Sequence, residues 1–194
     1  MVQRVDIEKL RVALRCVSRS NLLSVANRAI ELVPRARLGA LVAGIVRPEL
    51  ITEAAQRGLR NLSFPGRLTH AQKAEELRTA DVFVMPSHSE GVPKVTQEAA
   101  ASGVPCIVFG YYEPPSVIDG QNGYLVWSDG ELERRLRKLL ENPSLCASMG
   151  RAGREMARAW DWSVVAPRWE HALVKVIESF DGARTTEHCH GKAK

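Results

Sequence analysis

The sequence has no long apolar run, no tight pair of cysteines and few aromatic residues. No window approaches the roughly 20 apolar residues of a membrane-spanning helix, and the opening MVQRVDIEKL has no apolar stretch typical of a signal peptide. The four cysteines, Cys16, Cys106, Cys146 and Cys189, form no CxxC motif. The sequence therefore predicts a soluble cytoplasmic protein without a disulfide framework.

The aromatic and charged residues narrow the range of partners. Aromatic residues make up 6% of the chain and do not interleave with basic ones, so we expect no nucleic acid as a partner. The net charge of +5, from 27 Lys and Arg against 22 Asp and Glu, favours anionic partners such as nucleotide phosphates or anionic lipids. The basic residues are scattered along the chain, as expected for a solvated surface. Peripheral contact with the inner face of the membrane stays open.

Two further motifs are absent or incomplete. A GxGxxG fingerprint after a strand is missing, since Gly44 stands alone after an apolar run, and this counts against an oxidoreductase. His188-Cys189-His190 offers donor atoms suited to a transition metal, but no further ligands follow at a fixed spacing. We therefore expect neither a metal site nor a cofactor.

What the sequence does contain is short apolar segments alternating with longer segments of helical spacing. The expected strands are residues 11–17, 38–46, 62–64, 81–86, 105–109 and 124–127. The expected helices are residues 22–33, 48–58, 70–80, 94–102, 130–140, 143–159 and 164–180. This alternation predicts an α/β fold with a Rossmann-like parallel sheet flanked by helices. We expect one domain over residues 1–180 and a polar, disordered tail over residues 181–194.

The segment from Ser87 to Ala100 combines two carboxylates with a helix start. Glu90 lies on the expected loop and Glu98, with seven residues between them, lies early in the following helix. A helix N-terminus suits a diphosphate, and Gly91 lets a ligand approach the backbone closely. Glu98 would accept hydrogen bonds from ribose hydroxyls, while Glu90 would hold the transferred sugar. A glutamate near a helix start also serves the helix dipole, so the spacing leaves a purely structural role open.

Neighbouring residues fit the same interpretation. Lys94 would add a cation where negative charge builds on a leaving diphosphate. Pro93 loses no helical hydrogen bond at a helix start. His88 either touches a phosphate or the sugar or is an ordinary loop residue.

This segment and its surroundings resemble the C-terminal domain of the GT-B glycosyltransferases, in the large retaining family marked by Glu-x7-Glu (glycosyl transferases group 1, family 4). The motifs that carry the resemblance are, in order, ARLGALVAGIV, NLSFPGRL, PSHSEGVPKVTQEAAASGVPCIV, DGQNGYLV, SMGRAGREMA and WDWSVVAPRWE. Together they cover roughly residues 36–170. The resemblance implies one half of a GT-B enzyme.

The resemblance also implies a role for each matching residue. Glu90 matches the carboxylate beside the donor sugar, and Glu98 matches the one that binds the ribose. The loop that contacts the diphosphate corresponds to Gly91, Val92, Pro93, Lys94, Val95 and Thr96, with His88 beside it. The implied donor is a UDP- or GDP-linked sugar, transferred with retention of the anomeric configuration and without a metal ion.

The sequence departs from the family pattern in two places. The family usually has an Arg and a Lys after the first strand, which neutralise the diphosphate. Here Arg15 and Arg19 are the candidates for these catalytic cations, and the Lys is missing. A solvated position explains both arginines equally well. Relatives also have an N-terminal acceptor domain, to which we find no counterpart in this chain.

The expected function is therefore the donor-binding domain of a hexosyltransferase with a glycan or lipid acceptor, working with a missing acceptor domain. The alternatives are a non-catalytic nucleotide-sugar-binding module or a subunit of a split enzyme with a separate acceptor-domain chain. A sugar-nucleotide epimerase is a third interpretation. We expect Trp160, Trp162 and Trp169 to pack in the core or against the missing domain.

Overall fold

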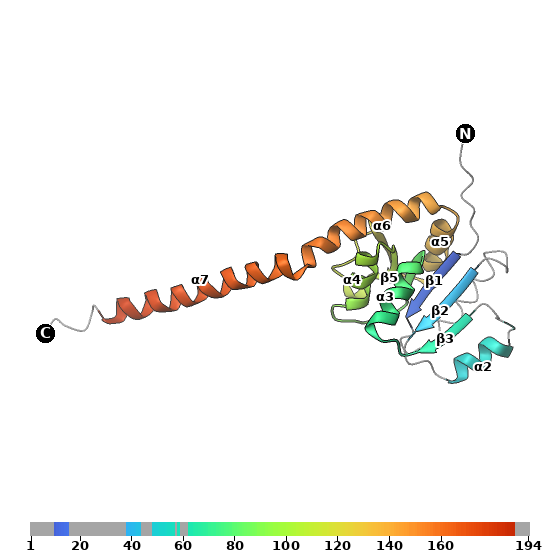
Figure 1. Cartoon of the computed structure of the whole chain (residues 1–194), viewed down its shortest axis with the longest axis horizontal. Coiled ribbons are helices and arrows are strands. Elements are labelled where there is room, and N and C mark those ends of the chain that lie inside the picture. The colour runs from blue at the N-terminus through green and yellow to red at the C-terminus, as the bar shows by residue number, and fades with distance from the viewer. Residues whose placement is uncertain (1–9, 16–37, 44–47, 57, 59–61, 189–194) are drawn as a thin grey trace. The chain divides into compact units, whose positions relative to one another are not determined.

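The computed structural model describes residues 10–15, 38–43, 48–56, 58 and 62–188 (Figure 1). Two compact units make up the chain, Met1–Ala157 and Arg158–Lys194. The boundary between them thus precedes residue 180, where we expected the domain to end. The predicted helix over residues 22–33 lies outside the described residues, as do Arg19 and Cys189.

A six-stranded parallel sheet forms the centre of the first unit. Its strands are β1 (Leu10–Arg15), β2 (Leu38–Ala43), β3 (Leu62–Gly66), β4 (Val82–Met85), β5 (Cys106–Phe109) and β6 (Gly123–Val126). All six were predicted from the sequence. The strand order is β3-β2-β1-β4-β5-β6. This is the doubly wound Rossmann order, so the predicted fold class is confirmed.

The strands beside the centre of the sheet are buried on both faces. Every residue of β4 and of β5 is buried, which is why both read as continuous apolar runs rather than alternating ones. The core cluster around them consists of Leu77, Phe83, Met85, Ala99, Val104, Cys106, Val108 and Val117. Because β4 is fixed so firmly, the loop that follows it starts from a rigid position.

Helices follow the strands in the alternating order that the sequence predicts. They are α2 (Pro48–Gln56), α3 (His70–Thr79), α4 (Lys94–Ser102), α5 (Asp129–Leu140) and α6 (Pro143–Ala157). Thr69 and Gln72 form a capping box at the start of α3, as expected for a threonine at that place. Gly103 ends α4 with φ 78°, a left-handed conformation that glycine adopts without steric cost.

Helix α6 packs against α4 at two of its glycines. A Cβ at Gly150 would lie 2.0 Å from the carbonyl oxygen of Gly103, so the backbones touch there. A Cβ at Gly153 would lie 3.4 Å from the Cα of Ala100, which is also close. Arg154 then donates a hydrogen bond of 2.8 Å to the carbonyl of Ser102. These contacts fix the helix that carries Glu98.

The second unit contains one long helix, α7 (Trp162–His188), with Pro167 inside it. The helix therefore continues past residue 180, where we expected a disordered tail to start. Trp162, Trp169 and Phe180 are 73%, 63% and 68% exposed, and their spacing places them on one face of the helix. Trp160, in the short helix before α7, is half-buried. None of the described helices is long and apolar enough to cross a membrane.

Candidate functional site

The site lies where the strand order of the sheet reverses. β1 and β4 are neighbours, with Leu14 paired to Val84, although two other strands separate them in the chain. In doubly wound sheets ligands bind at the carboxyl ends of the strands beside this reversal. β4 ends at Met85, and residues 86–93 then lead into α4. The predicted loop is therefore at the ligand-binding edge of the sheet.

Arg15 lies at this same edge. It is the last residue of β1, so the backbone places it beside the end of β4. It is one of the two cations that we predicted for the diphosphate. Arg19, the second predicted cation, lies outside the described residues.

Glu90 is held in the loop by a buried serine. The hydroxyl of Ser87 is 2.9 Å from Oε1 of Glu90 and 3.1 Å from the carbonyl oxygen of Ser89. Ser87 is only 3% exposed, whereas Glu90 is partly exposed. The serine thus limits the orientations of the Glu90 carboxylate while leaving part of it open to solvent.

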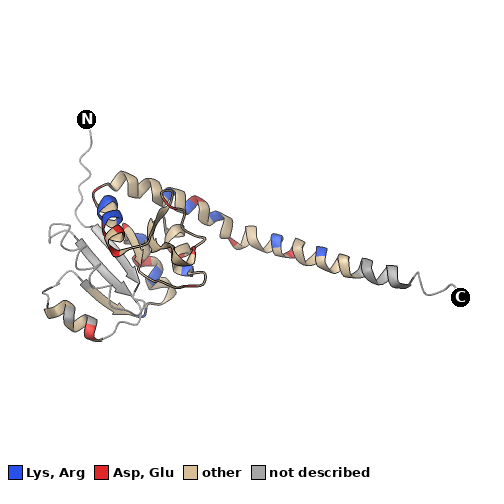
Figure 2. Cartoon of the chain, turned by 180° about the vertical axis from the view of Figure 1, so that it is seen from behind, with Lys and Arg blue, Asp and Glu red and all other residues tan. Residues whose placement is uncertain are grey.

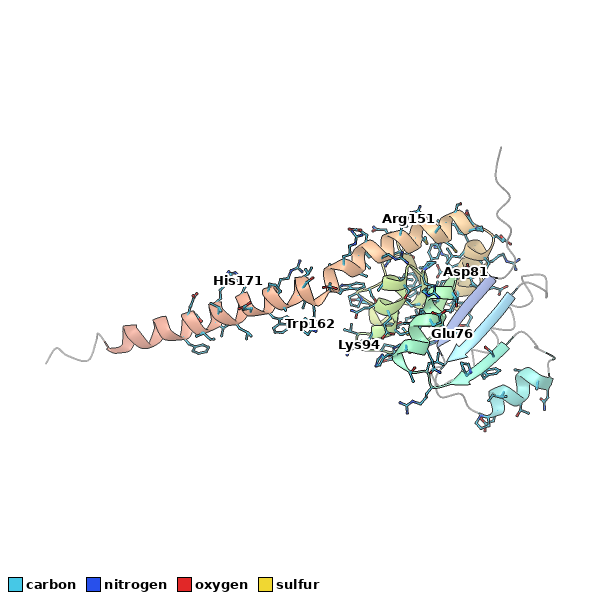
Figure 3. The ribbon with its side chains drawn as sticks, viewed as in Figure 1. Glu76, Asp81, Lys94, Arg151, Trp162 and His171 are labelled. Atoms are coloured by element: carbon cyan, nitrogen blue, oxygen red, sulfur yellow. The ribbon has the colours of Figure 1, made fainter. Side chains whose placement is uncertain are left out.

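The first turn of α4 has backbone groups available for an anion. Pro93 is its N-cap and, among the described residues, no side chain caps this end, whereas Ser128 caps α5. Gly91, Val92 and Lys94 are exposed, and Lys94 lies at the start of α4 (Figure 3). An uncapped helix start with exposed N–H groups suits a phosphate.

Thr96 supports this turn from inside. Its hydroxyl is 2.7 Å from the carbonyl oxygen of Pro93 and 2.5 Å from the hydroxyl of Ser116, and the side chain is completely buried. Its N–H donates to the carbonyl oxygen of Pro93 at 3.2 Å. Thr96 therefore fixes the loop geometry with its side chain, while the exposed neighbours face the solvent.

Glu98, one turn further along α4, forms an ion pair with Lys73 of α3. The Lys73 ammonium lies 2.6 Å from each carboxylate oxygen of Glu98 and donates a hydrogen bond to Oε1. Oε2 is buried and accepts no hydrogen bond from the described residues. The two oxygens of Glu98 are therefore not equally accessible to a ribose.

His88 belongs to an aromatic group behind the loop. Its ring centroid is 4.5 Å from that of Phe109 and 5.4 Å from that of Tyr111. The imidazole remains exposed. This position is compatible with both interpretations of His88, contact with a phosphate or the sugar and an ordinary loop residue.

Sequence reasoning missed the two side chains that hold the carboxylates. Ser87 lies within a motif that we quoted, and its spacing of three residues from Glu90 was a usable signal. Lys73 is 25 residues from Glu98, on another helix. Only the packing of α3 on α4 brings the two together.

Among the described residues, the other charged side chains and the cysteines form no second candidate site. Figure 2 shows Lys and Arg interspersed with Asp and Glu over the described helices. In the described part of the chain no group of three or more His, Cys, Asp or Glu residues could hold a metal ion. Burial raises the pKa of Cys106 to about 12, and burial with the Asp81 carboxylate raises that of Cys146 to about 12. Neither thiol is a nucleophile at neutral pH.

The fold and the site together define a class of protein. It is a Rossmann-like domain in which the loop after β4 carries Glu90 and the helix that follows carries Glu98. No side chain among the described residues caps the start of that helix.

The comparisons with known proteins agree with that description. Residues 23–156 match the model of the family "Glycosyl transferases group 1". A D-inositol 3-phosphate glycosyltransferase of Streptomyces avermitilis is 34% identical over 128 residues, covering 63% of this chain and 28% of the relative. The chain thus spans less than a third of that relative.

Two solved structures share the fold. A mutant of S. aureus TarM in complex with Fondaparinux, alpha-GlcNAc-glycerol and UDP matches with a TM-score of 0.70 and 21% identity, over 84% of this chain and 35% of that one. The C-terminal domain of the group 1 glycosyl transferase LpcC from Francisella tularensis matches with a TM-score of 0.63 and 23% identity, over 77% of this chain and 85% of that one. This chain belongs to the group 1 glycosyl transferase family, and its first unit has the fold of the C-terminal half of a GT-B enzyme.

Proposed function

We propose that this chain is the donor-binding domain of a retaining, metal-independent hexosyltransferase whose donor is a nucleoside-diphosphate sugar. The observation that carries the proposal is the arrangement around α4. One helix start has Glu90 on the loop before it and Glu98 within it, and Ser87 and Lys73 position the two carboxylates. The arrangement lies at the edge of the sheet where Rossmann-like folds bind nucleotides.

Each part of such a donor has a counterpart in the site. The diphosphate would lie on the N–H groups of Gly91 to Val95, where the helix dipole favours negative charge. The ribose would donate hydrogen bonds to Glu98, and the hexose hydroxyls would donate to Glu90. As the bond from the anomeric carbon to the phosphate oxygen breaks, the acceptor oxygen would bond to that carbon from the same face of the sugar, which gives retention. The leaving phosphate would take the proton of the acceptor hydroxyl.

Metal independence requires cations from the protein. Arg15 lies at the carboxyl end of β1, on the same edge of the sheet as the loop after β4. Lys94 is exposed at the start of α4. Two positive side chains and a helix dipole would stabilise the charge that develops on the leaving diphosphate. We include Arg19 in this role on the strength of the sequence.

The acceptor side is a separate part of the proposal. Because the chain spans 28% of the Streptomyces relative, we propose that transfer to a glycan or lipid requires an acceptor-binding unit, on the same protein or on a separate chain. A nucleotide-sugar-binding module without its own transferase activity is the second candidate. The partial coverage of the relative favours this second candidate too. A cytoplasmic location with peripheral membrane contact fits both candidates.

Calorimetric titration with UDP and GDP in EDTA tests donor binding. We expect one of the two to bind, and Glu98→Ala to weaken binding by about tenfold to a hundredfold, as for loss of a hydrogen bond to a charged acceptor. Glu75→Ala is the matched control, because Glu75 is an exposed carboxylate on α3 that pairs with Arg78. No binding of either nucleotide, or equal binding by Glu98→Ala, contradicts the proposal.

Turnover separates the two candidates. A transferase hydrolyses or transfers a UDP- or GDP-linked hexose without divalent metal, by itself or after addition of an acceptor-domain protein. A binding module shows no turnover in either case.

A further inference from the structure

Lys73 and Glu98 form the one ion pair in the described residues that joins α3 to α4 at the site. The ammonium is 2.6 Å from both carboxylate oxygens, and the two side chains are 30% and 33% exposed. Exposed pairs within one helix, such as Arg78 with Glu75, contribute little and vary in geometry. A partly buried contact between two helices restricts both side chains more strongly.

The backbone that carries Lys73 is itself well fixed. Lys73 lies in the first turn of α3, where its N–H donates to the carbonyl oxygen of Thr69 at 2.9 Å. The Thr69–Gln72 capping box closes the same turn. The backbone at Lys73 is therefore well fixed, and the position of the ammonium determines the orientation of the Glu98 carboxylate.

This contact changes what Glu98 offers to a ligand. Oε2 is sealed from solvent, so a ribose hydroxyl would have to use the lone pairs of Oε1 that the ammonium leaves free. A glutamate without such a partner would sample several rotamers and lose entropy when it binds. An already oriented carboxylate avoids this cost.

We infer that Lys73 is a positioning residue of the nucleotide site, which orients Glu98 so that Oε1 accepts a hydrogen bond from the ribose. The inference rests on the proposed function, since it assumes that a nucleotide occupies this site. Lys73 does not itself contact the reacting atoms.

The inference makes a prediction that simple charge attraction does not. A cation that only attracts the diphosphate strengthens binding of ribonucleotides and dideoxyribonucleotides equally. A residue that orients Glu98 strengthens only the ribonucleotide. The ratio of the two affinities therefore reports the orientation of the carboxylate.

The experiment is calorimetric titration with UDP or GDP, whichever the wild-type protein binds, and with its 2′,3′-dideoxy counterpart. For Lys73→Met we expect the affinity for the ribonucleotide to fall about fivefold, as for the loss of one hydrogen bond, and that for the dideoxy form to change less than about twofold. Lys73→Met combined with Glu98→Gln should bind no more weakly than Glu98→Gln. Lys73→Arg should restore most of the ribonucleotide affinity.

Arg78→Met is the matched control, because Arg78 is an exposed cation on the same helix that pairs with Glu75. It should leave both affinities unchanged, and thermal unfolding should confirm that each variant folds. An equal loss for both nucleotides, a gain in affinity, or no change in Lys73→Met overturns the role of Lys73 while the proposed function stands. If the wild-type protein binds neither UDP nor GDP, the proposed function fails and the inference fails with it.

Discussion

Ser87 donates a hydrogen bond of 2.9 Å to Oε1 of Glu90, so the first carboxylate of the site is oriented by a buried hydroxyl two residues after β4. Removal of this hydroxyl should affect the part of the donor that Glu90 holds. We expect Ser87→Ala to weaken binding of the hexose-linked nucleotide about fivefold while the nucleoside diphosphate binds as before. Titration with UDP and UDP-glucose, or with GDP and GDP-mannose, measures this difference.

Ser144→Ala is the control for that prediction, because the Ser144 hydroxyl also bonds to a nearby side chain but lies on the surface at the start of α6. It should change neither affinity. An equal effect of Ser87→Ala on both ligands would mean that the serine supports the loop as a whole rather than Glu90.

Because the backbones of Gly150 and Gly103 are in contact, we expect a side chain at Gly150 to lower the stability of the fold strongly. A Cβ at Gly150 would lie 2.0 Å from the Gly103 carbonyl oxygen, so α6 would have to move away from α4. We expect Gly150→Ala to lower the free energy of unfolding by about 2 kcal/mol, within the range of overpacked sites. Urea unfolding followed by circular dichroism measures it.

Gly130→Ala is the matched helical control. A Cβ there would meet only the end of the Arg134 side chain at 3.7 Å. Its free energy of unfolding should stay the same or rise by up to about 1 kcal/mol, because alanine restricts the unfolded chain. Equal behaviour of the two variants would show that α4 and α6 do not touch as described.

The raised pKa values of the two described cysteines, buried Cys106 and half-buried Cys146, predict slow reaction with alkylating agents. The pKa of both Cys106 and Cys146 is raised to about 12, from an ordinary value of 9.0, so both stay protonated in the folded protein at pH 8. Iodoacetamide followed by peptide mass spectrometry should label them only after unfolding. Above about pH 9 the unfolded thiols ionise first, so their contribution to stability falls as the pH rises towards 12. Rapid labelling of Cys106 in the folded protein at pH 8 would contradict its burial.

Loss of the capping box of α3 should lower the stability less than the Gly150→Ala change does. Thr69 accepts a hydrogen bond from the N–H of Gln72, and the Gln72 side chain accepts one from the N–H of Thr69. Thr69→Ala should lower the free energy of unfolding by about 1 kcal/mol. Thr52→Ala should cost less, because the Thr52 hydroxyl only bonds back to the carbonyl of Pro48 within α2. Chemical denaturation of both variants compares them, and an equal loss would contradict the cap.

The sheet was predictable because its strands are buried on both faces. The runs DVFVMP and PCIVF contain β4 and β5, and proline or glycine marks the ends of most neighbouring elements. The helices expected over residues 48–58 and 94–102 end close to Gly58 and Gly103, which both have a positive φ that glycine adopts without steric cost. The C-terminal end of α7 was not predictable, because the polar residues beyond Phe180 are compatible with either a helix or a disordered tail.

The backbone elements of the site were predictable, but the side-chain contacts that hold the two glutamates were not. A strand, a loop with Glu90 and a helix with Glu98 follow from the local sequence. The ion pair from Lys73 depends on how α3 packs against α4, and a single sequence does not encode such contacts in any local pattern. The unequal access of the two Glu98 oxygens follows from that same contact.

The most direct test of the account is the location of a bound nucleotide. Amide NMR spectra of the ¹⁵N-labelled protein, recorded during titration with UDP or GDP in EDTA, report which backbone N–H groups it contacts. We expect the largest saturable shifts on Gly91, Val92, Lys94 and Val95, before and within the first turn of α4. Saturable shifts confined to another part of the chain, or no shifts with either nucleotide, would contradict it.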